Sequence, residues 1–331
     1  MKLGIAGTGK IVQEALPVLL EAGAKPGQIL LMGRESSAER TRKLWERYQL
    51  GGYVLDFEEL LASDADTIYI ALPNQLHCEC TERALRSGKH VILEKPAAVR
   101  RAELARLFAI AEEEHKILVE AMTLHYLPAW ISLKEKLADL GEIKLVNFTF
   151  CQYSSRYDAF QRGEIAPAFD PACAGGALTD LNVYNLHAIL GLFGTPDAVT
   201  YYPNMERGVD TSGILILNYG SFQAVLVAAK DCQAPVSSTI QGTKGCIRIP
   251  VPANQVNCYE LWNNKKEVQR FDFSSERHRM YWEFVEFFRM IEEQDFAAAK
   301  SMQAVSLEAA GVLETARAQN CFEIGGQVYY F

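Results

Sequence analysis

The opening of the chain strongly limits how it can fold. A short apolar segment at residues 3–6 leads directly into Gly7-Thr8-Gly9 and then into an amphipathic stretch over residues 10–21. Glycines permit a tight turn between strand and helix and let backbone N–H groups approach a pyrophosphate at the helix N-terminus. The third small residue of this dinucleotide-binding fingerprint would fall at position 12, where the chain has Val12. A plain tight turn is the alternative, and the pattern that follows favours dinucleotide binding.

Short apolar runs alternate with longer amphipathic runs up to about residue 120. This alternation predicts βαβ units, and therefore an N-terminal Rossmann domain of the α/β class with a doubly wound parallel sheet. The strands are expected at residues 3–6, 29–32, 53–55, 67–71, 90–93 and 117–119, and the helices at residues 10–21, 37–48, 76–87 and 101–115.

The pattern changes to longer, β-rich, alternating segments in the rest of the chain. These segments predict a C-terminal α+β domain with a large, mostly antiparallel open sheet. The strands are expected at residues 144–153, 198–202, 213–219, 222–229, 238–241 and 246–249, and the helices at residues 177–193, 279–292 and 301–320. A chain of 331 residues suits two domains, which we place at residues 1–120 and 121–331.

Composition excludes some classes of partner. The chain has 33 basic and 41 acidic residues, a net charge of −8, and no basic block, so we expect no nucleic-acid partner. No apolar stretch approaches the length of a membrane span, and the N-terminal apolar segment is too short for a signal peptide. The cysteines are scattered without zinc-type spacing, which predicts reduced thiols in a cytoplasmic protein and no metal site. They are Cys78, Cys80, Cys151, Cys173, Cys232, Cys246, Cys258 and Cys321.

The residues after the second predicted strand bear on the choice between NAD and NADP. An acidic residue at this place holds the ribose 2′-OH of NAD, whereas an arginine suits the 2′-phosphate of NADP. Arg34, Ser36 and Ser37 favour NADP, while Glu35 leaves NAD open. The alternative for Arg34 is a solvated loop charge.

The tripeptide Glu94-Lys95-Pro96 ends an apolar run at residues 91–93. A lysine at the end of a buried strand is suited to stabilise a developing oxyanion beside a nicotinamide. Pro96 restricts the backbone after the strand, which favours a positioned lysine over an exposed strand-end lysine.

Four segments occur together in the order and spacing of one family. They are Gly7-Thr8-Gly9-Lys10-Ile11, Leu72-Pro73-Asn74-x-x-His77, Glu94-Lys95-Pro96 and Gly175-Gly176-Ala177-Leu178-x-Asp180. Over nearly its whole length the chain resembles the Gfo/Idh/MocA family, which takes its name from glucose-fructose oxidoreductase and inositol dehydrogenase. The resemblance implies a Rossmann domain and a substrate-binding α/β domain. The open sheet of the second domain would form the interface of a homodimer or homotetramer.

The same resemblance implies an activity and a cofactor site. The expected reaction is NAD(P)-dependent hydride transfer to or from a carbinol of a sugar, cyclitol or trans-dihydrodiol. Lys95 would reach both the nicotinamide ribose and the substrate. The implied cofactor-binding residues are Gly7, Thr8, Gly9, Lys10, Ile11, Arg34, Ser36, Leu72, Pro73, Asn74, His77, Glu94 and Lys95. For His77, a capping or packing role at a helix N-terminus is an equal alternative.

Asp180, Tyr184 and His187 have the spacing i, i+4, i+7, which places them on one face of the helix predicted at residues 177–193. Many family members carry Asp-x-x-x-His here. Tyr184 replaces that histidine, as in the branch that resembles dimeric dihydrodiol dehydrogenase. A tyrosine with a pKa of about 10 needs a neighbouring cation to act as a base, and Lys95 is the available group. Our hypothesis is that Tyr184 takes the hydroxyl proton, Lys95 stabilises the oxyanion, and Asp180 orients substrate or lysine.

Substrate contacts are less visible. His125 and Tyr126 follow the predicted domain crossover, Arg156 lies in a polar segment at residues 153–157, and His187 lies on the predicted helix. Arg156 could clamp a carboxylate or phosphate, or form a structural ion pair at a sheet edge. For His187 we prefer the alternative of a hydrogen-bonded core histidine, and the alternative for Tyr184 is an amphipathic core residue with a satisfied hydroxyl. Two other functions stay open: redox-assisted glycoside cleavage, and a cofactor-sensing regulator without turnover.

Overall fold

A computed structural model describes residues 1–319, 322–324 and 327–329, so Cys321 and the end of the helix predicted to reach residue 320 lie outside the described residues. The chain forms two compact units. The first consists of Met1–Thr123 and Arg277–Leu307, and the second of Leu124–Glu276 with the described residues from Glu308 onward. The first unit thus includes residues 277–307 in addition to the segment expected for a Rossmann domain.

The first unit contains a six-stranded parallel sheet in the order typical of a Rossmann fold. The strands in spatial order are β3 (Gly52–Val54), β2 (Ile29–Met32), β1 (Leu3–Ala6), β4 (Thr67–Ile70), β5 (His90–Glu94) and β6 (Leu118–Ala121). The strand order reverses between β1 and β4, both of which are buried along their whole length. The carboxyl ends of the parallel strands therefore meet at one edge, beside this switch point.

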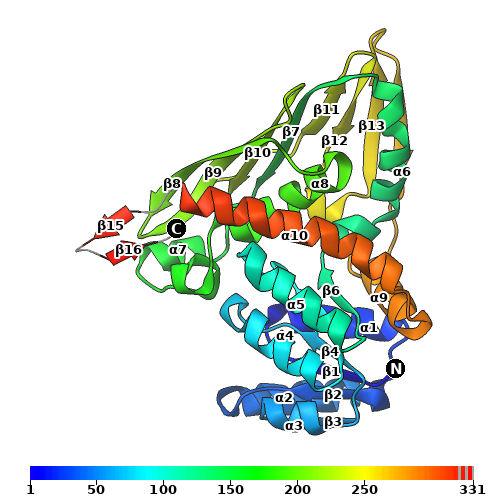
Figure 1. The fold of residues 1–331 in the computed structure, drawn as a ribbon, viewed down its shortest axis with the longest axis vertical. Coiled ribbons are helices and arrows are strands. Elements are labelled where there is room, and N and C mark those ends of the chain that lie inside the picture. Colours follow the sequence, from blue (N-terminus) through cyan, green and yellow to red (C-terminus); the bar gives the residue numbers. More distant parts are fainter. Residues whose placement is uncertain (320–321, 325–326, 330–331) are drawn as a thin grey trace. The chain divides into compact units, whose positions relative to one another are not determined.

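Helices follow the strands of the first unit, and two more arrive from the C-terminal part of the chain (Figure 1). They are α1 (Lys10–Glu21), α2 (Ala38–Tyr48), α3 (Phe57–Ala62), α4 (His77–Arg86), α5 (Arg101–Glu113), α9 (Tyr281–Glu293) and the first part of α10 (Phe296–Ala318). Helix α9 contacts α1, and Arg277 before α9 forms an ion pair with Glu21 at 2.5 Å.

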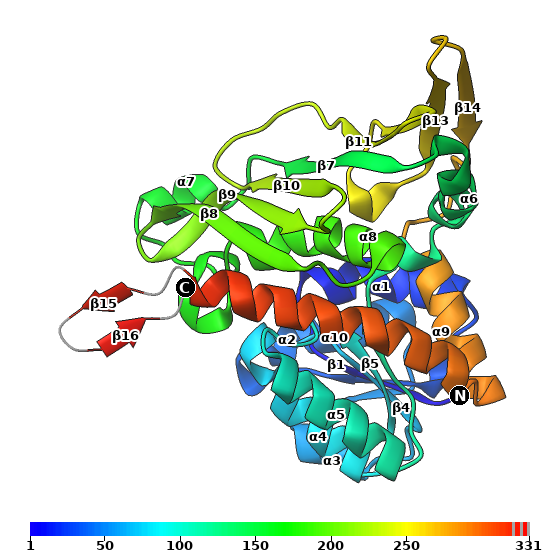
Figure 2. The same ribbon diagram turned by 45° about the horizontal axis from the view of Figure 1, so that its top comes forward.

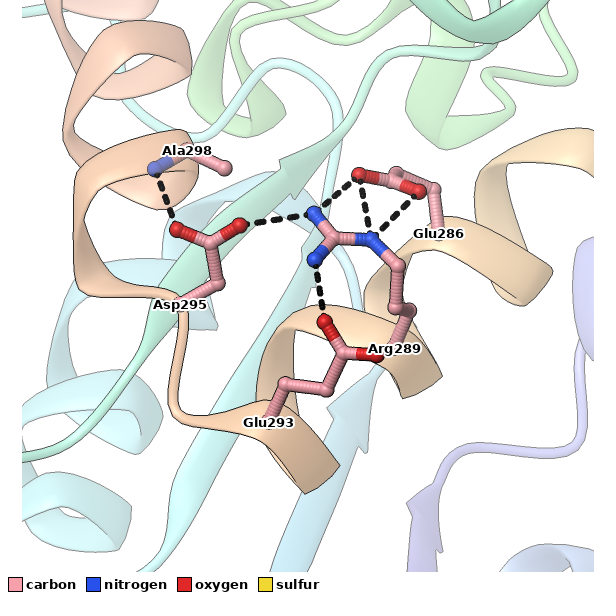
Figure 3. A network of polar contacts seen from close by, with 5 residues as sticks. All are labelled: Glu286, Arg289, Glu293, Asp295 and Ala298. Atoms are coloured by element: carbon pink, nitrogen blue, oxygen red, sulfur yellow. Dashed lines mark hydrogen bonds and ion pairs between the residues drawn. The ribbon is translucent and has the colours of Figure 1, made fainter.

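The corner between α9 and α10 is fixed by one arginine and one helix cap (Figure 3). Arg289 bonds the carboxylates of Glu286, Glu293 and Asp295 at 2.6, 2.7 and 2.8 Å. Asp295 also accepts a bond from the Ala298 amide at 3.0 Å, as an N-cap residue does. This cap explains why α10 begins at Phe296, five residues before the predicted start at residue 301.

The second unit contains an eight-stranded sheet that is antiparallel except where β10 pairs with β7. The strands in spatial order are β14 (Val268–Asp272), β13 (Cys258–Asn263), β12 (Gly245–Ile249), β11 (Ser238–Gly242), β7 (Ile143–Cys151), β10 (Gln223–Ala229), β9 (Val209–Asn218) and β8 (Ala198–Glu206). Helix α8 (Val183–Phe193) contacts β7 and β10, and α6 (Pro128–Lys136) contacts β13. The unit also contains α7 (Tyr157–Gln161), and the described residues near the C-terminus include β15 (Phe322–Ile324) and β16 (Gln327–Tyr329).

The fold class is as predicted, and several elements were missed. The β13–β14 hairpin extends the sheet at one end (Figure 2), and its charged, half-exposed strands lack the apolar alternation that marked the other strands. Helices α3, α6 and α7 are short and were taken as connections. Within the described residues, no helix is both long and apolar enough to cross a membrane.

Candidate functional site

The turn between β1 and α1 has the shape of a phosphate-binding turn. Gly7 has φ +125°, and a Cβ there would lie 2.5 Å from the Ala71 carbonyl oxygen, so only glycine fits. A Cβ at Gly9, by contrast, would meet no atom within 4 Å, which leaves the helix N-terminus open to a ligand. Thr8 is buried between them, whereas Lys10 is exposed and pairs with Glu14.

A pocket of about 700 Å³ lies beside the carboxyl end of β2. Ser36 and Ser37 from the loop and Arg40, Lys43 and Arg47 from α2 line it, together with Glu35 and Glu39. The guanidinium of Arg40 donates to the Thr8 hydroxyl at 3.2 Å, which connects this pocket to the β1–α1 turn. Arg34 is exposed, and its backbone N–H donates to the Ser37 hydroxyl at 3.0 Å.

The turn after β4 is tied to the turn after β5 by His77. This side chain is buried, with Nδ1 lying 3.0 Å from the Pro96 carbonyl oxygen and Nε2 2.9 Å from that of Leu72. Burial lowers the pKa of His77, so the neutral imidazole bonds one carbonyl as donor. Pro73 and Asn74 are half-buried just before it. The position of His77 suits a brace between two turns; a direct cofactor contact stays a prediction.

Lys95 lies half-buried at the end of β5, above a layer of carboxyl groups. The hydroxyl of Tyr69 donates to Glu94 Oε1 at 2.5 Å, and the Lys95 amide donates to Glu94 Oε2 at 3.3 Å. Burial of this carboxylate raises the pKa of Glu94, while the Tyr69 bond and the Lys95 charge act in the opposite direction. Glu120 at the end of β6 accepts from the Ala97 amide at 2.8 Å. The turn that presents Lys95 is thus held by carboxyl groups at the ends of β5 and β6.

A second buried carboxylate, Glu283 on α9, belongs to the same layer. Its Oε1 accepts from the Thr123 hydroxyl at 2.9 Å, and Arg279 donates to that hydroxyl at 3.3 Å. Burial, and next the charge of Glu94, raise the pKa of Glu283 to about 8. Sequence reasoning missed this residue, because it lies far along the chain from the motifs that it supports.

In the second unit, Gly176 and Asp210 lie at the start of the helix that carries Asp180 and Tyr184. Gly176 has φ +123°, and a Cβ there would collide with the Asp210 carboxylate. Asp210 on β9 accepts from the Leu178 amide and from the Tyr201 hydroxyl, both at 2.6 Å. Burial raises the pKa of Asp210 to about 7, although both bonds lower it. Gly176 therefore makes room for an aspartate that caps the helix, whereas a Cβ at Gly175 would lie 2.6 Å from the Pro167 carbonyl oxygen.

The helix that follows begins with a π-helical segment, η8 (Leu178–Asn182), before α8. Asp180 lies in this segment and is 36% exposed, while Tyr184 is buried in the first turn of α8 and its ring lies 6.1 Å from that of Phe150. Asp180 pairs at 2.8 Å with the ammonium of Lys230, a residue that sequence reasoning did not identify. The α-helical spacing expected from Asp180 to His187 is thus interrupted at its start by wider π-helical turns.

His125 and His187 form a buried pair in the second unit. His125 Nε2 and His187 Nδ1 lie 3.2 Å apart, and burial followed by the charge of His187 lowers the pKa of His125 well below its ordinary value. Tyr126 is buried beside them in the chain. The hydrogen-bonded arrangement matches the core interpretation of His187, and substrate contact by these residues stays a prediction.

Arg156 is exposed immediately before α7. Within the described part of the chain its guanidinium forms no ion pair, so the alternative of a structural ion pair at the sheet edge has no partner there. A role in binding a substrate anion stays a prediction. Among the described residues, no group of three or more His, Cys, Asp or Glu is placed to hold a metal ion.

Comparisons with known proteins agree with this geometry. A family model described as "Oxidoreductase family, NAD-binding Rossmann fold" matches residues 1–122, and one described as "GFO/IDH/MocA C-terminal domain" matches residues 132–248. The chain is 33% identical to a scyllo-inositol 2-dehydrogenase (NADP(+)) of Bacillus subtilis, over 86% of this chain and 87% of the relative. It is 28% identical to a trans-1,2-dihydrobenzene-1,2-diol dehydrogenase of Xenopus tropicalis, over 75% of each chain.

Solved structures show the same fold. A 3-ketoreductase from Actinomadura kijaniata, solved in complex with NADP and TDP-benzene, superposes with a TM-score of 0.79 at 22% identity and covers 96% of each chain. Further structures of that enzyme contain single replacements of a lysine or of a tyrosine.

Proposed function

The chain belongs to the Gfo/Idh/MocA family of NAD(P)-dependent oxidoreductases, and we propose that it transfers a hydride between NADP and a carbinol of a cyclitol, sugar or trans-diol. One observation carries the proposal. The phosphate-binding turn, the Arg40 pocket and the half-buried Lys95 all follow carboxyl ends of parallel strands, and so lie at the edge where Rossmann folds bind dinucleotides.

The residues present at that edge fit the cofactor. Gly7 and Gly9 would let the α1 N-terminus hold the pyrophosphate, with Lys10 and Ile11 in its first turn. Ser36, Arg40 and Lys43 would hold a 2′-phosphate, because they line one pocket. Arg34 precedes this loop and is not one of the lining residues, so its contact with the 2′-phosphate stays a prediction. When bound, the nicotinamide supplies or accepts the hydride at C4.

Tyr184 would act as the general base, and Lys95 would stabilise the oxyanion. In the oxidation direction, Tyr184 accepts the proton of the substrate hydroxyl, and Lys95 stabilises the negative charge that develops on that oxygen. A cation beside the phenol would favour the phenolate that such a base requires. Asp180 accepts a hydrogen bond from the substrate or from Lys95. The proposal therefore requires that Lys95 and Tyr184 meet in the active complex.

The substrate class rests on the relatives. One is a scyllo-inositol dehydrogenase and another a trans-dihydrodiol dehydrogenase, which both act on hydroxyls of six-membered rings. Neither a regulator without turnover nor a redox-assisted glycosidase gains support from them. His125, Tyr126, Arg156 and His187 remain our candidates for substrate contacts. We also propose a cytoplasmic homodimer or homotetramer formed through the open sheet.

Two measurements test this function. Fluorescence titration with NADPH and NADH should give tighter binding of NADPH. A screen over inositols, sugars and trans-diols should then show reduction of NADP by at least one substrate class. Binding of NADPH with no turnover across the screen would contradict the oxidoreductase proposal and favour a sensor.

Cofactor preference can be tested at Arg40. The variant Arg40→Ala should weaken NADPH binding by about tenfold and leave NADH binding nearly unchanged, because only NADPH carries the 2′-phosphate. Arg86→Ala is the matched control, since Arg86 on α4 pairs with Glu82 and Glu114, and none of these three residues lines the pocket. Equal losses for both cofactors would place Arg40 at the pyrophosphate instead.

A further inference from the structure

Lys230 follows β10 and lies in the interior of the second unit, with 2% of its side chain exposed. Its ammonium donates to the Ala168 carbonyl oxygen at 2.5 Å and to Asp180 Oδ2 at 2.8 Å. It also lies 4.3 Å from the centroid of the Phe169 ring. Burying an ammonium is costly unless it is paired and hydrogen-bonded, so this site is built around a positive charge.

Asp180 faces two environments. One carboxylate oxygen bonds the buried ammonium from the inside, while 36% of the side chain remains exposed. The residue lies in η8, and π-helical turns often occur at functional sites. The arrangement has an interior cation behind a surface carboxylate, one helical turn before Tyr184.

We infer that Lys230 is a positioning residue that holds Asp180 in one orientation and in its ionised form. Asp180 then acts only as a hydrogen-bond acceptor, for a substrate hydroxyl or for a cation. This inference rests on the proposed function and adds to it a residue that contacts no substrate.

Two acids lie near the pair on or just after neighbouring strands in the described part of the chain. Asp210 on β9 is bonded by Tyr201 from β8, and its charge interacts with that of Lys230. Asp231 follows Lys230 and accepts from the hydroxyls of Thr211 and Ser212. The loop at residues 167–169 provides a carbonyl and an aromatic ring but no charge. Because Asp210 and Asp231 are acids, replacing Lys230 removes a positive charge that offsets theirs beside Asp180.

The test compares Lys230→Met and Lys230→Arg with a packing control. Phe160→Leu loosens the same core, because its ring stacks on Phe169 at 4.8 Å, but it leaves the ammonium in place. Carboxyl-detected NMR of the full chain follows the titration of Asp180, whose signal is assigned by its absence in Asp180→Asn. The pH profile of kcat is measured in parallel on the substrate found in the screen.

The expected result is an upward shift of the Asp180 titration by about one pH unit or more in Lys230→Met, with little shift in Lys230→Arg or Phe160→Leu. The acidic limb of the kcat profile should move in the same direction, with kcat reduced about tenfold at low pH and NADPH binding unchanged. Lys230→Gln repeats the test if Lys230→Met does not fold.

Two outcomes would overturn the inference. One is an Asp180 titration that is the same in Lys230→Met and wild type. The other is a shifted titration with an unmoved kcat profile, since Lys230 would then be a structural residue only. If the wild type has no turnover, the proposed function fails, and the NMR titration still decides whether Lys230 controls the charge of Asp180.

Discussion

The turn at Lys95 and the start of the helix at Asp180 are similar in architecture but opposite in charge. Each presents a charged side chain at the end of a buried element. Lys95 lies above buried acids, among them Glu94 and Glu283, whereas Asp180 lies above the buried ammonium of Lys230. In both places ionisable groups of the opposite type lie behind the presented group, with carboxyl groups near Lys95 and an ammonium near Asp180.

The two regions differ in how their supports are distributed along the chain. Glu94 is adjacent to Lys95 and Glu120 lies on the next strand of the sheet, whereas Glu283 comes from α9. The start of the helix depends on Asp210 and Lys230, which lie on other strands. Replacing residues that act on the substrate should therefore lower kcat in both regions. Replacing the residues that support them should change stability to different extents in the two regions.

The largest effect is expected from Lys95 and from Tyr184, which lies one helical turn after Asp180. Lys95→Met and Tyr184→Phe should each reduce kcat by about a hundredfold or more, because each removes a group that acts on the reacting oxygen. If the two act as a unit, the double variant should lose little more than either single variant. Tyr202→Phe, an exposed phenol on β8, serves as the control. Full turnover in either variant, with normal NADPH binding, would end the assignment.

The next effect concerns Gly176, whose left-handed backbone makes room for Asp210 at the start of the helix. Gly176→Ala should lower the free energy of unfolding by about 2–3 kcal/mol, because the left-handed backbone is strained and the added Cβ displaces Asp210. Gly23→Ala is the control, since Gly23 has a similar φ of +113° but no atom within 4 Å. Urea unfolding measures both. Equal losses would show that strain, and not the collision, decides the cost.

The smallest effect tests the acids below Lys95. Glu283 has its pKa raised to about 8, so between about pH 5 and 8 the folded chain binds more protons than the unfolded chain. Stability from this group is present at low pH and is lost as pH rises through that value. Glu283→Gln removes the loss, so between about pH 6 and 7 its free energy of unfolding, measured with urea, should rise relative to that of the wild type by at most about 1.4 kcal/mol.

The exposed carboxylate variant Glu113→Gln is the matched control for that titration. Parallel pH curves for wild type and Glu283→Gln would contradict the buried titration.

The fold and the motif-bearing residues could be predicted because their signals are local. The strand, turn and helix at residues 3–21 have the bounds that the pattern indicates. Lys230, Asp210 and Glu283 could not be found in this way, because a buried charge is recognised only by its partners, and these lie on other elements. The predicted start of helix α10 was too late in the sequence, because its N-cap residue, Asp295, follows α9 without a recognisable loop between them.

The discontinuity of the first unit has a consequence for synthesis on the ribosome. Its sheet is complete once Ala121 has been made, but Arg279, Glu283 and helix α9 come more than a hundred and fifty residues later. The nascent Rossmann segment therefore lacks the hydrogen bonds of Thr123 with Arg279 and Glu283 until α9 has left the exit tunnel. Recombinant fragments that stop after the sheet would contain the nucleotide-binding turn but would lack Arg279 and Glu283, which contact Thr123.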